Sequence, residues 1–383
     1  MTVYLDNSAT TKPRREVSEL AADMMKDGWQ NPSALYRPAM EVQKRIDRVR
    51  ETCLQAAGAA GCRIVFTSGG TESDNLALIG HLRTRRGHGT VLISSVEHPA
   101  VSACSDEMRR MGYEVKEIPS GYRGTVDLRK LEDMLAPDVV MISVMQVNNE
   151  TGAIEPLDEI VKLRNRICPG AAIHVDGVQG FLRVPVAFNR LGIQSYAFSG
   201  HKIHALKGTG ALIIAKGHPV KPLQYGGGQE GSLRSGTENT LGILSLGCAV
   251  EAWDPDACVR IQDMKYRLWS EIHTRIPEAK VNGPDPNDET SAPHILNVAL
   301  EPVRSQTMLF ALEGDGIYVS AGSACASRKQ KVSPVLRAMG IPTQRADCSL
   351  RFSLSRDNMM EEILYTADRV AVQYENLKKY TRR

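Results

Sequence analysis

The segments Ala171-Ala172-Ile173-His174-Val175 and Ser195-Tyr196-Ala197-Phe198 decide how this chain folds. Each is predicted to be a short buried strand, and each is followed by a functional group. Asp176 ends the first strand, and the second continues into Ser199-Gly200-His201-Lys202. Ligands bind outside the carboxyl ends of the strands in open α/β sheets. We therefore expect Asp176 and Lys202 to point into one crevice.

An acid and an amine at neighbouring strand ends match the needs of pyridoxal phosphate (PLP). The carboxylate would keep the pyridine nitrogen protonated, so that the ring acts as an electron sink, and the lysine would form a Schiff base with the aldehyde. The same two residues also fit a structural ion pair between Asp176 and Lys202 at the rim of a sheet. Taken alone, they leave both interpretations open.

Length and composition restrict the class of protein. With 383 residues the chain is longer than one domain usually is, so two domains are expected. Its 42% hydrophobic and 24% charged residues are ordinary for a soluble globular protein. The formal charge of +3 gives no argument for nucleic-acid binding, and no apolar run approaches the ~20 residues of a membrane span.

The cysteines and the N-terminus bear on the compartment. The eight cysteines are scattered and none forms a C-x-x-C pair, which argues against a disulfide framework and a zinc site. No basic segment followed by an apolar one opens the chain, so a signal peptide is not indicated. A cytoplasmic protein without a metal site is expected.

A candidate anion site follows another predicted strand. The strand Arg63–Thr67 runs into Ser68-Gly69-Gly70-Thr71, and a helix is predicted from Glu72 to Leu82. Glycine lets the backbone close around a ligand, and the free amides and dipole of a helix N-terminus favour negative charge. The same pattern is also common at helix starts that bind nothing.

Two further predicted strands end in polar residues. Thr90–Ser94 is followed by Glu97-His98, where a histidine is more often structural than catalytic. Val139–Val147 is apolar and rich in β-branched residues, which is typical of a central strand. The polar cluster Asn148–Gly152 comes directly after it and lies at another carboxyl strand end.

The C-terminal part of the chain differs in pattern from the rest. Asp254-Pro255-Asp256 marks the expected boundary between a large domain, 16–254, and a small C-terminal domain, 255–383. Residues 1–15 are expected to pack with the small domain. Helices packed on one antiparallel sheet would give this domain an α+β fold.

Ten short motifs occur along the chain: Leu5–Thr11, Thr67–Glu72, Glu97-His98, Val147–Glu150, His174–Asp176, Ser199–Lys202, Gly227–Glu230, Arg234–Thr237, Ser323–Cys325 and Arg351–Leu354. In this order they resemble the NifS/IscS-type cysteine desulfurases, which are PLP enzymes of the class V aminotransferase group. The resemblance covers essentially the whole chain. It implies an α/β protein with the PLP-dependent transferase fold type I, in which the large domain holds a mostly parallel seven-stranded sheet and the smaller domain is α+β.

The resemblance also implies a role for individual positions. Lys202 would hold PLP and move the proton of the substrate's α-carbon, Asp176 would pair with the pyridinium nitrogen, and His98 would stack on the ring and shuttle protons. Gln179 and Asn149 would lie near the phenolic oxygen of the ring, with Asn149 also near the substrate carboxylate.

The phosphate and the substrate have their own implied ligands. The phosphate would be held by Gly70, Thr71, Ser199 and His201, joined by Thr237 from the other subunit of a homodimer. Arg351 would hold the carboxylate of L-cysteine, because its planar fork suits bidentate pairing.

Cys325 is the residue that would separate a desulfurase from a transaminase. A free cysteine is usually a small buried hydrophobe, and the other seven are interpreted in that way. Cys325, however, lies among Ser, Gly and Ala, and Arg328, Lys329 and Lys331 follow it and would favour the reactive thiolate. The resemblance implies that this thiolate takes sulfur from L-cysteine, leaving L-alanine and a persulfide. An acceptor protein of iron–sulfur cluster assembly, or of tRNA or thiamine thiolation, would receive the sulfur.

Other functions remain open for the same scaffold. They are selenocysteine lyase, cysteine-sulfinate desulfinase, class V aminotransferase, and a dimeric scaffold without catalysis. Ile203–Gly208 lacks the Gly-Pro that the family commonly has before Lys-Gly, and Ser355 stands where glycine is common. These departures concern the subgroup and the sulfur acceptor rather than the reaction class. No direct nucleic-acid or membrane partner is expected.

Overall fold

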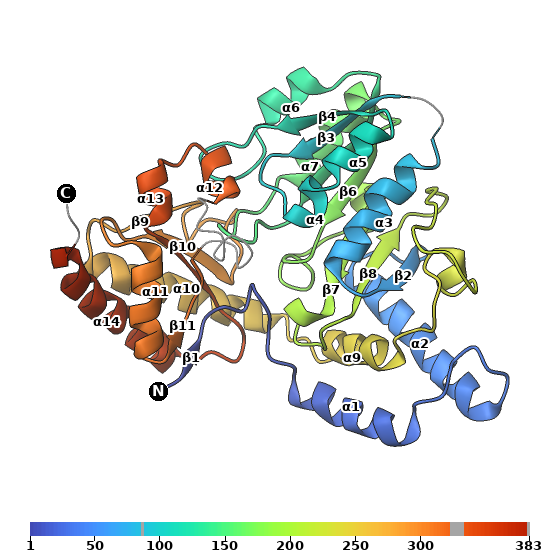
Figure 1. The fold of residues 1–383 in the computed structure, drawn as a ribbon, viewed down its shortest axis with the longest axis horizontal. Helices are drawn as coiled ribbons and strands as arrows, with labels where there is room; N and C mark the ends of the chain where they lie inside the picture. The colour runs from blue at the N-terminus through green and yellow to red at the C-terminus, as the bar shows by residue number, and fades with distance from the viewer. Residues whose placement is uncertain (86–87, 322–332, 381–383) are drawn as a thin grey trace.

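The computed structural model describes residues 1–85, 88–321 and 333–380 (Figure 1). Within these residues the central sheet has seven strands. In spatial order they are β2 (Arg63–Thr67), β8 (Gly210–Ile214), β7 (Ser195–Ser199), β6 (Ala172–Asp176), β5 (Val139–Met145), β3 (Thr90–Ser94) and β4 (Glu114–Ile118). β8 is antiparallel to both of its neighbours, and the other adjacent pairs are parallel. The expected mostly parallel seven-stranded sheet is confirmed.

Helices cover both faces of this sheet, which is why its inner strands are buried along their whole length and mostly apolar. One face packs against α3 (Gly70–Leu82), α4 (Pro99–Ser102) and α5 (Ser105–Arg110). The helices of the other face and its margins are α1 (Arg15–Asp27), α2 (Arg37–Ala56), α6 (Leu128–Met134), α7 (Leu157–Ile167), α8 (Phe188–Leu191) and α9 (Thr240–Glu251). The sheet is therefore the middle layer of three.

The C-terminal part has its own small sheet and its own core. The antiparallel strands β9 (Lys280–Val281), β10 (Ile295–Ala299) and β12 (Ser349–Ser353) lie in the order β12-β10-β9. The helices are α10 (Asp256–Arg275), α11 (Ser305–Gly314), α12 (Pro334–Ala338), α13 (Thr343–Asp347) and α14 (Met360–Leu377). Long amphipathic helices α10 and α14 pack against each other and bury the apolar face of the sheet.

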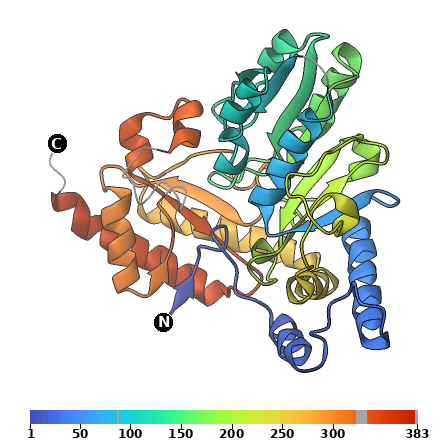
Figure 2. The same cartoon turned by 45° about the vertical axis from the view of Figure 1, so that its right-hand side comes forward.

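The N-terminal strand joins this second core. β1 (Val3–Tyr4) pairs in parallel with β11 (Ile317–Tyr318), and Val3 and Leu5 are fully buried among residues of the C-terminal part. Figures 1 and 2 both show β1 beside the C-terminal elements, while α1 and α2 lie at the large sheet. We propose that the two cores correspond to the expected domains, with the N-terminal segment packing on the smaller one.

Two predicted boundaries shift by two residues. The helix after β2 begins at Gly70 rather than at Glu72, so that Gly70 and Thr71 belong to its first turn. β5 ends at Met145 rather than at Val147, because Val147 leaves the sheet and pairs with Ile154. Both shifts lie at carboxyl strand ends, where the backbone turns away from the ladder.

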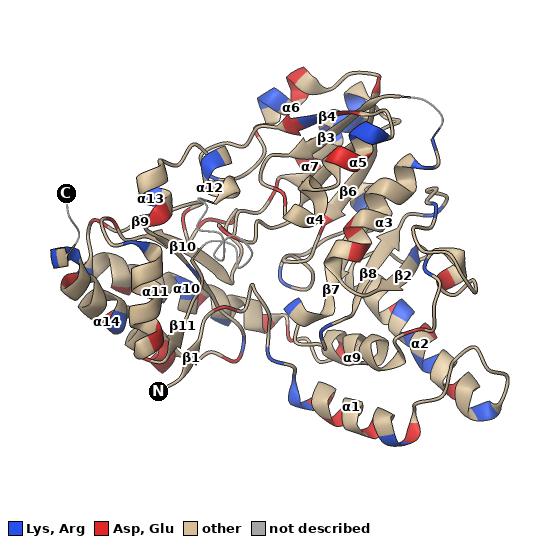
Figure 3. Cartoon of the chain, in the orientation of Figure 1, with Lys and Arg blue, Asp and Glu red and all other residues tan. Residues whose placement is uncertain are grey.

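Positive and negative residues are mixed along the chain in Figure 3. Lys and Arg occur together with Asp and Glu on α1, α6 and α14. This mixture agrees with the small formal charge of the chain. In the described part of the chain, the helices are either too short or too polar to cross a lipid bilayer.

Candidate active site

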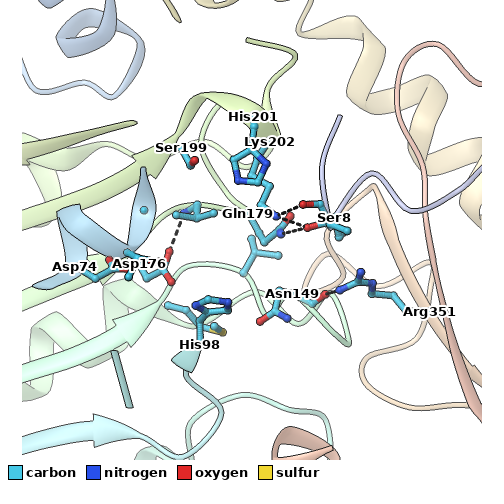
Figure 4. A pocket seen from close by; sticks show the side chains of 16 residues that line it. Ser8, Asp74, His98, Asn149, Asp176, Gln179, Ser199, His201, Lys202 and Arg351 are labelled. Carbon is cyan, nitrogen blue, oxygen red and sulfur yellow. Dashed lines mark hydrogen bonds between the residues drawn. The ribbon is translucent and has the colours of Figure 1, made fainter. Parts of the chain in front are cut away.

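Asp176 and Lys202 lie at neighbouring strand ends, as the strand argument predicted. β6 and β7 are adjacent and parallel, with Asp176 in register with Ala197. Asp176 is the last residue of β6, and Lys202 closes a single 3-10 turn, Gly200–Lys202, directly after β7. Both side chains line one cavity of about 250 Å³ (Figure 4). This volume is just below the range of ~300–1,000 Å³ usual for small-molecule pockets.

Side-chain alternation decides which strand residues reach the cavity. Ile173 and Val175 of β6 belong to the core on the α2, α7 and α9 face. Successive side chains of a strand point to opposite faces, so His174 and Asp176 point toward α3. His174 accordingly hydrogen-bonds Asp74 of that helix, with Nε2 and Oδ1 3.1 Å apart.

The carboxylate of Asp176 is buried in a cluster of ionisable groups. Its Oδ1 accepts a hydrogen bond from the backbone N–H of Val178 at 2.9 Å. Burial raises the pKa of Asp176 to about 7, and the nearby carboxyl of Asp74 adds to the rise, while His98 opposes it. A protonated ring nitrogen placed against this carboxylate would favour its charged form.

The amine of Lys202 is held by backbone carbonyls. Its Nζ donates to the oxygens of Ser8 at 2.5 Å and Ala9 at 2.8 Å. These carbonyls, rather than the carboxylate of Asp176, are its hydrogen-bond partners among the described residues, which does not favour the structural ion-pair interpretation. Burial lowers the pKa of Lys202 to about 7, and the positive charge of Arg351 adds to this effect. A large fraction of the amine is therefore neutral, and thus nucleophilic, near neutral pH.

His98 begins helix α4 and presents a defined tautomer. The backbone N–H of Ala100 donates to His98 Nδ1 at 3.1 Å, so the neutral ring carries its proton on Nε2. Burial lowers the pKa of His98, and the positive charge of Lys202 also lowers it, although Asp176 opposes both. The ring lines the same cavity as Asp176 and Lys202.

One end of the cavity is suited to an anion. Gly70 and Thr71 bring the first turn of α3 to the cavity, and Ser199 and His201 line it from the end of β7. A Cβ on Gly70 would lie 2.6 Å from Val178 Cγ2, so glycine is required there. Ser199 Oγ is buried and has no hydrogen-bond partner in the described part of the chain. An orphaned hydroxyl beside a helix N-terminus fits a phosphate ligand.

Arg351 and Asn149 lie at the other end. Arg351 comes from β12 and is 2% exposed. Its Nη1 donates to the backbone oxygen of Asn149 at 2.8 Å, and its Nη2 donates to Asp6 Oδ1 at 2.7 Å. Gln179 also lines the cavity and donates from Nε2 to the backbone oxygen of Ser8 at 3.0 Å.

Ten of the site residues predicted from the sequence line this one cavity: Gly70, Thr71, His98, Asn149, Asp176, Gln179, Ser199, His201, Lys202 and Arg351. Thr237 is exposed and does not line the cavity of its own chain. Cys325 lies outside the described residues, as do Arg328, Lys329 and Lys331.

Three of the described cysteines differ from the role expected of Cys325. Burial raises the pKa of Cys53 to about 12 and the pKa values of Cys104 and Cys348 to about 11. Thiols that resist ionisation are poor nucleophiles.

Sequence reasoning missed two acidic residues of the site. Asp74 lines the cavity and is buried on α3, and Asp6 is the partner of Arg351. Asp74 had a usable signal, because it lies about one turn after Thr71 and just before the apolar stretch of the same helix. Asp6 had none, since its contact joins residues 345 positions apart.

This fold and this set of cavity residues define a type I PLP-enzyme scaffold. The chain belongs to the aminotransferase class-V family, which it matches over residues 3–365. Within that family it is similar to proteins named cysteine desulfurase.

The relatives cover nearly the whole chain. The cysteine desulfurase IscS of Dictyoglomus turgidum is 36% identical over 96% of this chain and 93% of its own length. The cysteine desulfurase NifS of Azotobacter vinelandii is 36% identical over 94% of this chain and 90% of its own length. A solved NifS-like protein superposes with a TM-score of 0.91 at 31% identity, covering 98% of this chain and 100% of that one. The expected family and fold are confirmed.

Proposed function

We propose that this protein is a PLP-dependent cysteine desulfurase that converts L-cysteine to L-alanine and leaves a persulfide on Cys325. One observation carries the proposal: a half-buried amine, a buried carboxylate and a buried guanidinium, from Lys202, Asp176 and Arg351, line the same cavity. That cavity occurs in a chain 36% identical to named cysteine desulfurases.

The residues present fit PLP. Lys202 would hold the aldehyde carbon, Asp176 the ring nitrogen, and Ser199, His201 and the α3 N-terminus the phosphate. Burial lowers the pKa of His201 to about 4, so it would donate to the phosphate as a neutral ring. When bound, PLP supplies an electron sink that stabilises negative charge on the α-carbon of an amino acid.

The side chains around the substrate have separate tasks. Arg351 binds the carboxylate and thereby fixes the α-carbon relative to Lys202. The Nζ of Lys202 takes the α-proton, which its lowered pKa allows near neutral pH. His98, which carries its proton on Nε2, would exchange a proton with the substrate thiol.

The sulfur step balances without a further reactant. The Cys325 thiolate attacks the substrate sulfur, so that a sulfur–sulfur bond forms and the bond from that sulfur to the β-carbon breaks. The electron pair of the broken bond ends on the β-carbon, which takes a proton. In sum, L-cysteine and an enzyme thiol become L-alanine and an enzyme persulfide.

The persulfide then passes to an acceptor protein of iron–sulfur cluster assembly or of tRNA or thiamine thiolation. The active form is a homodimer in which Thr237 completes the phosphate site of the opposite subunit. The exposure of Thr237 on its own chain supports this arrangement. The compartment proposed is the cytoplasm.

Mass spectrometry of the protein after exposure to L-cysteine tests the function. The peptide that contains Cys325 should gain the mass of one sulfur atom, and one L-alanine should form for each sulfur bound. Cys325→Ala should form neither product. If Cys325→Ala releases L-alanine at the wild-type rate, the protein is instead another PLP lyase on the same scaffold.

A further inference from the structure

Arg351 faces the cavity together with a counter-ion from its own chain. Its Nη2 donates to Asp6 Oδ1, whereas its Nε is buried and has no partner among the described residues. Asp6 thus neutralises one edge of the guanidinium, and one N–H group is left without a partner in the described part of the chain. The Arg351 side chain is 2% exposed and that of Asp6 21%, so water screens this pair only in part.

We propose that Asp6 is a positioning residue that sets the charge at Arg351 and so selects amino acids with a single anionic group. The inference rests on the proposed function, in which Arg351 binds the substrate carboxylate. Among the described residues, Arg351 and Lys202 are the Lys and Arg side chains that line the cavity. With Lys202 engaged by the cofactor and Arg351 already paired, a second negative charge on the substrate meets no further Lys or Arg side chain among the described residues that line the cavity.

The selectivity follows from the charge of Asp6 rather than from its hydrogen bond. A substrate carboxylate must share the guanidinium with Asp6, and like charges a few Å apart in a partly buried site repel each other. A neutral side chain, such as the thiol of L-cysteine, adds nothing to this repulsion. A sulfinate or a second carboxylate adds to it directly.

Asp6→Asn separates the two effects, because asparagine keeps an Oδ1 acceptor for Arg351 Nη2 and removes only the charge. Calorimetry on the cofactor-loaded protein would measure binding of L-alanine, which has one anionic group, and L-aspartate, which has two. We expect Asp6→Asn to bind L-alanine about fivefold more tightly, the lower end of typical coupling between sites. The affinity for L-aspartate should rise by a larger factor, so that the ratio of the two affinities, which favours L-alanine in the wild type, becomes smaller.

The steady-state kinetics should change in agreement with the binding affinities. In Asp6→Asn the KM for L-cysteine should fall with kcat little changed, and L-cysteine sulfinate should become a better substrate relative to L-cysteine. A purely structural role predicts the opposite sign, since a misplaced Arg351 would raise KM. Asp6→Ser, which also removes the charge, provides the same readouts if Asp6→Asn does not fold.

Asp315→Asn is a matched control. Asp315 is 18% exposed and pairs with Arg369 at 3.0 Å, away from the cavity. Its substitution should leave the affinities for L-alanine and L-aspartate unchanged.

Three outcomes would contradict a proposal. If Asp6→Asn weakens L-alanine binding or changes neither affinity, Asp6 does not set the charge at Arg351 and the inference is wrong. If the variants behave as expected but the wild type forms no persulfide, the proposed function fails while the role of Asp6 stands. If the wild type binds neither amino acid, both the proposed function and the proposed role of Asp6 are wrong.

Discussion

The two ends of the cavity are built in different ways. The cofactor end is formed by strand ends of the large sheet and by the N-terminus of one helix. Asp176, Ser199 and Lys202 lie within a span of 27 residues. The substrate end joins Asp6 and Arg351, which are 345 positions apart, and Asn149 between them. One end is therefore fixed by local topology, and the other depends on how the N-terminal segment and the C-terminal sheet meet the large sheet.

The difference predicts separate failures at the two ends. Substitutions at the cofactor end should abolish both cofactor binding and turnover. Damage at the substrate end should weaken substrate binding and leave the cofactor in place. Lys202 Nζ contacts the Ser8 and Ala9 carbonyls of the N-terminal segment, so the two ends meet at that amine.

The largest effect is expected from Lys202→Ala. Loss of both the covalent anchor and the base should lower turnover of L-cysteine by ~10³-fold or more, in line with general-base and nucleophilic contributions of ~10²–10⁴. The visible absorbance of a protein-bound imine should also be absent. A yellow Lys202→Ala protein that turns over L-cysteine would place the anchor elsewhere.

Lys265 gives a control for this chemistry. It is a buried lysine whose pKa is also lowered by burial to about 7, and its Nζ donates to Ser291 Oγ and the Ala292 oxygen. It does not line the cavity. Borohydride reduction of the PLP-loaded protein should therefore label the peptide with Lys202 and leave the peptide with Lys265 unlabelled.

The next effect is expected at the substrate end. Arg351→Lys should lower kcat/KM for L-cysteine by about 10- to 100-fold, mainly through KM, because a charged hydrogen bond contributes about 1.5–3 kcal/mol and an ammonium cannot pair bidentately. The cofactor absorbance should stay near the wild-type value. A loss of bound cofactor in Arg351→Lys would show that the two ends are not separable.

The pH dependence of cofactor capture is a smaller and reversible test. The pKa of Lys202 is lowered to about 7, so the protonated amine dominates below that pH and the neutral amine above it. The rate at which the cofactor-free protein forms an imine with PLP should rise about tenfold per pH unit up to pH ~7 and then level off. Stopped-flow absorbance would measure it. A rate that keeps rising toward pH 10 would mean that the amine has its ordinary pKa.

The same contrast explains what the sequence could predict. Lys202, Asp176 and the Gly70-Thr71 turn lie where strand ends must converge in a parallel sheet, so their meeting follows from element order alone. The Asp6–Arg351 pair depends on long-range packing of β1 against β11 and β12 against β10, which no local pattern specifies. The carbonyl partners of Lys202 were likewise invisible, because backbone oxygens carry no sequence signal.

The smallest effect is expected from Asp74, behind the cofactor end. Burial raises the pKa of Asp74 well above its ordinary value, which favours the protonated acid, and its Oδ1 lies 3.1 Å from His174 Nε2. Asp74→Asn keeps a neutral group of the same shape and should change kcat and the absorbance of bound cofactor by less than about twofold.

Asp74→Ala leaves the buried His174 Nε2 unpaired and should lower the free energy of unfolding by about 1–3 kcal/mol. Denaturant unfolding measures the second result. If Asp74→Asn instead shifts the pH dependence of the cofactor spectrum, Asp74 is ionised and shares control of the Asp176 charge.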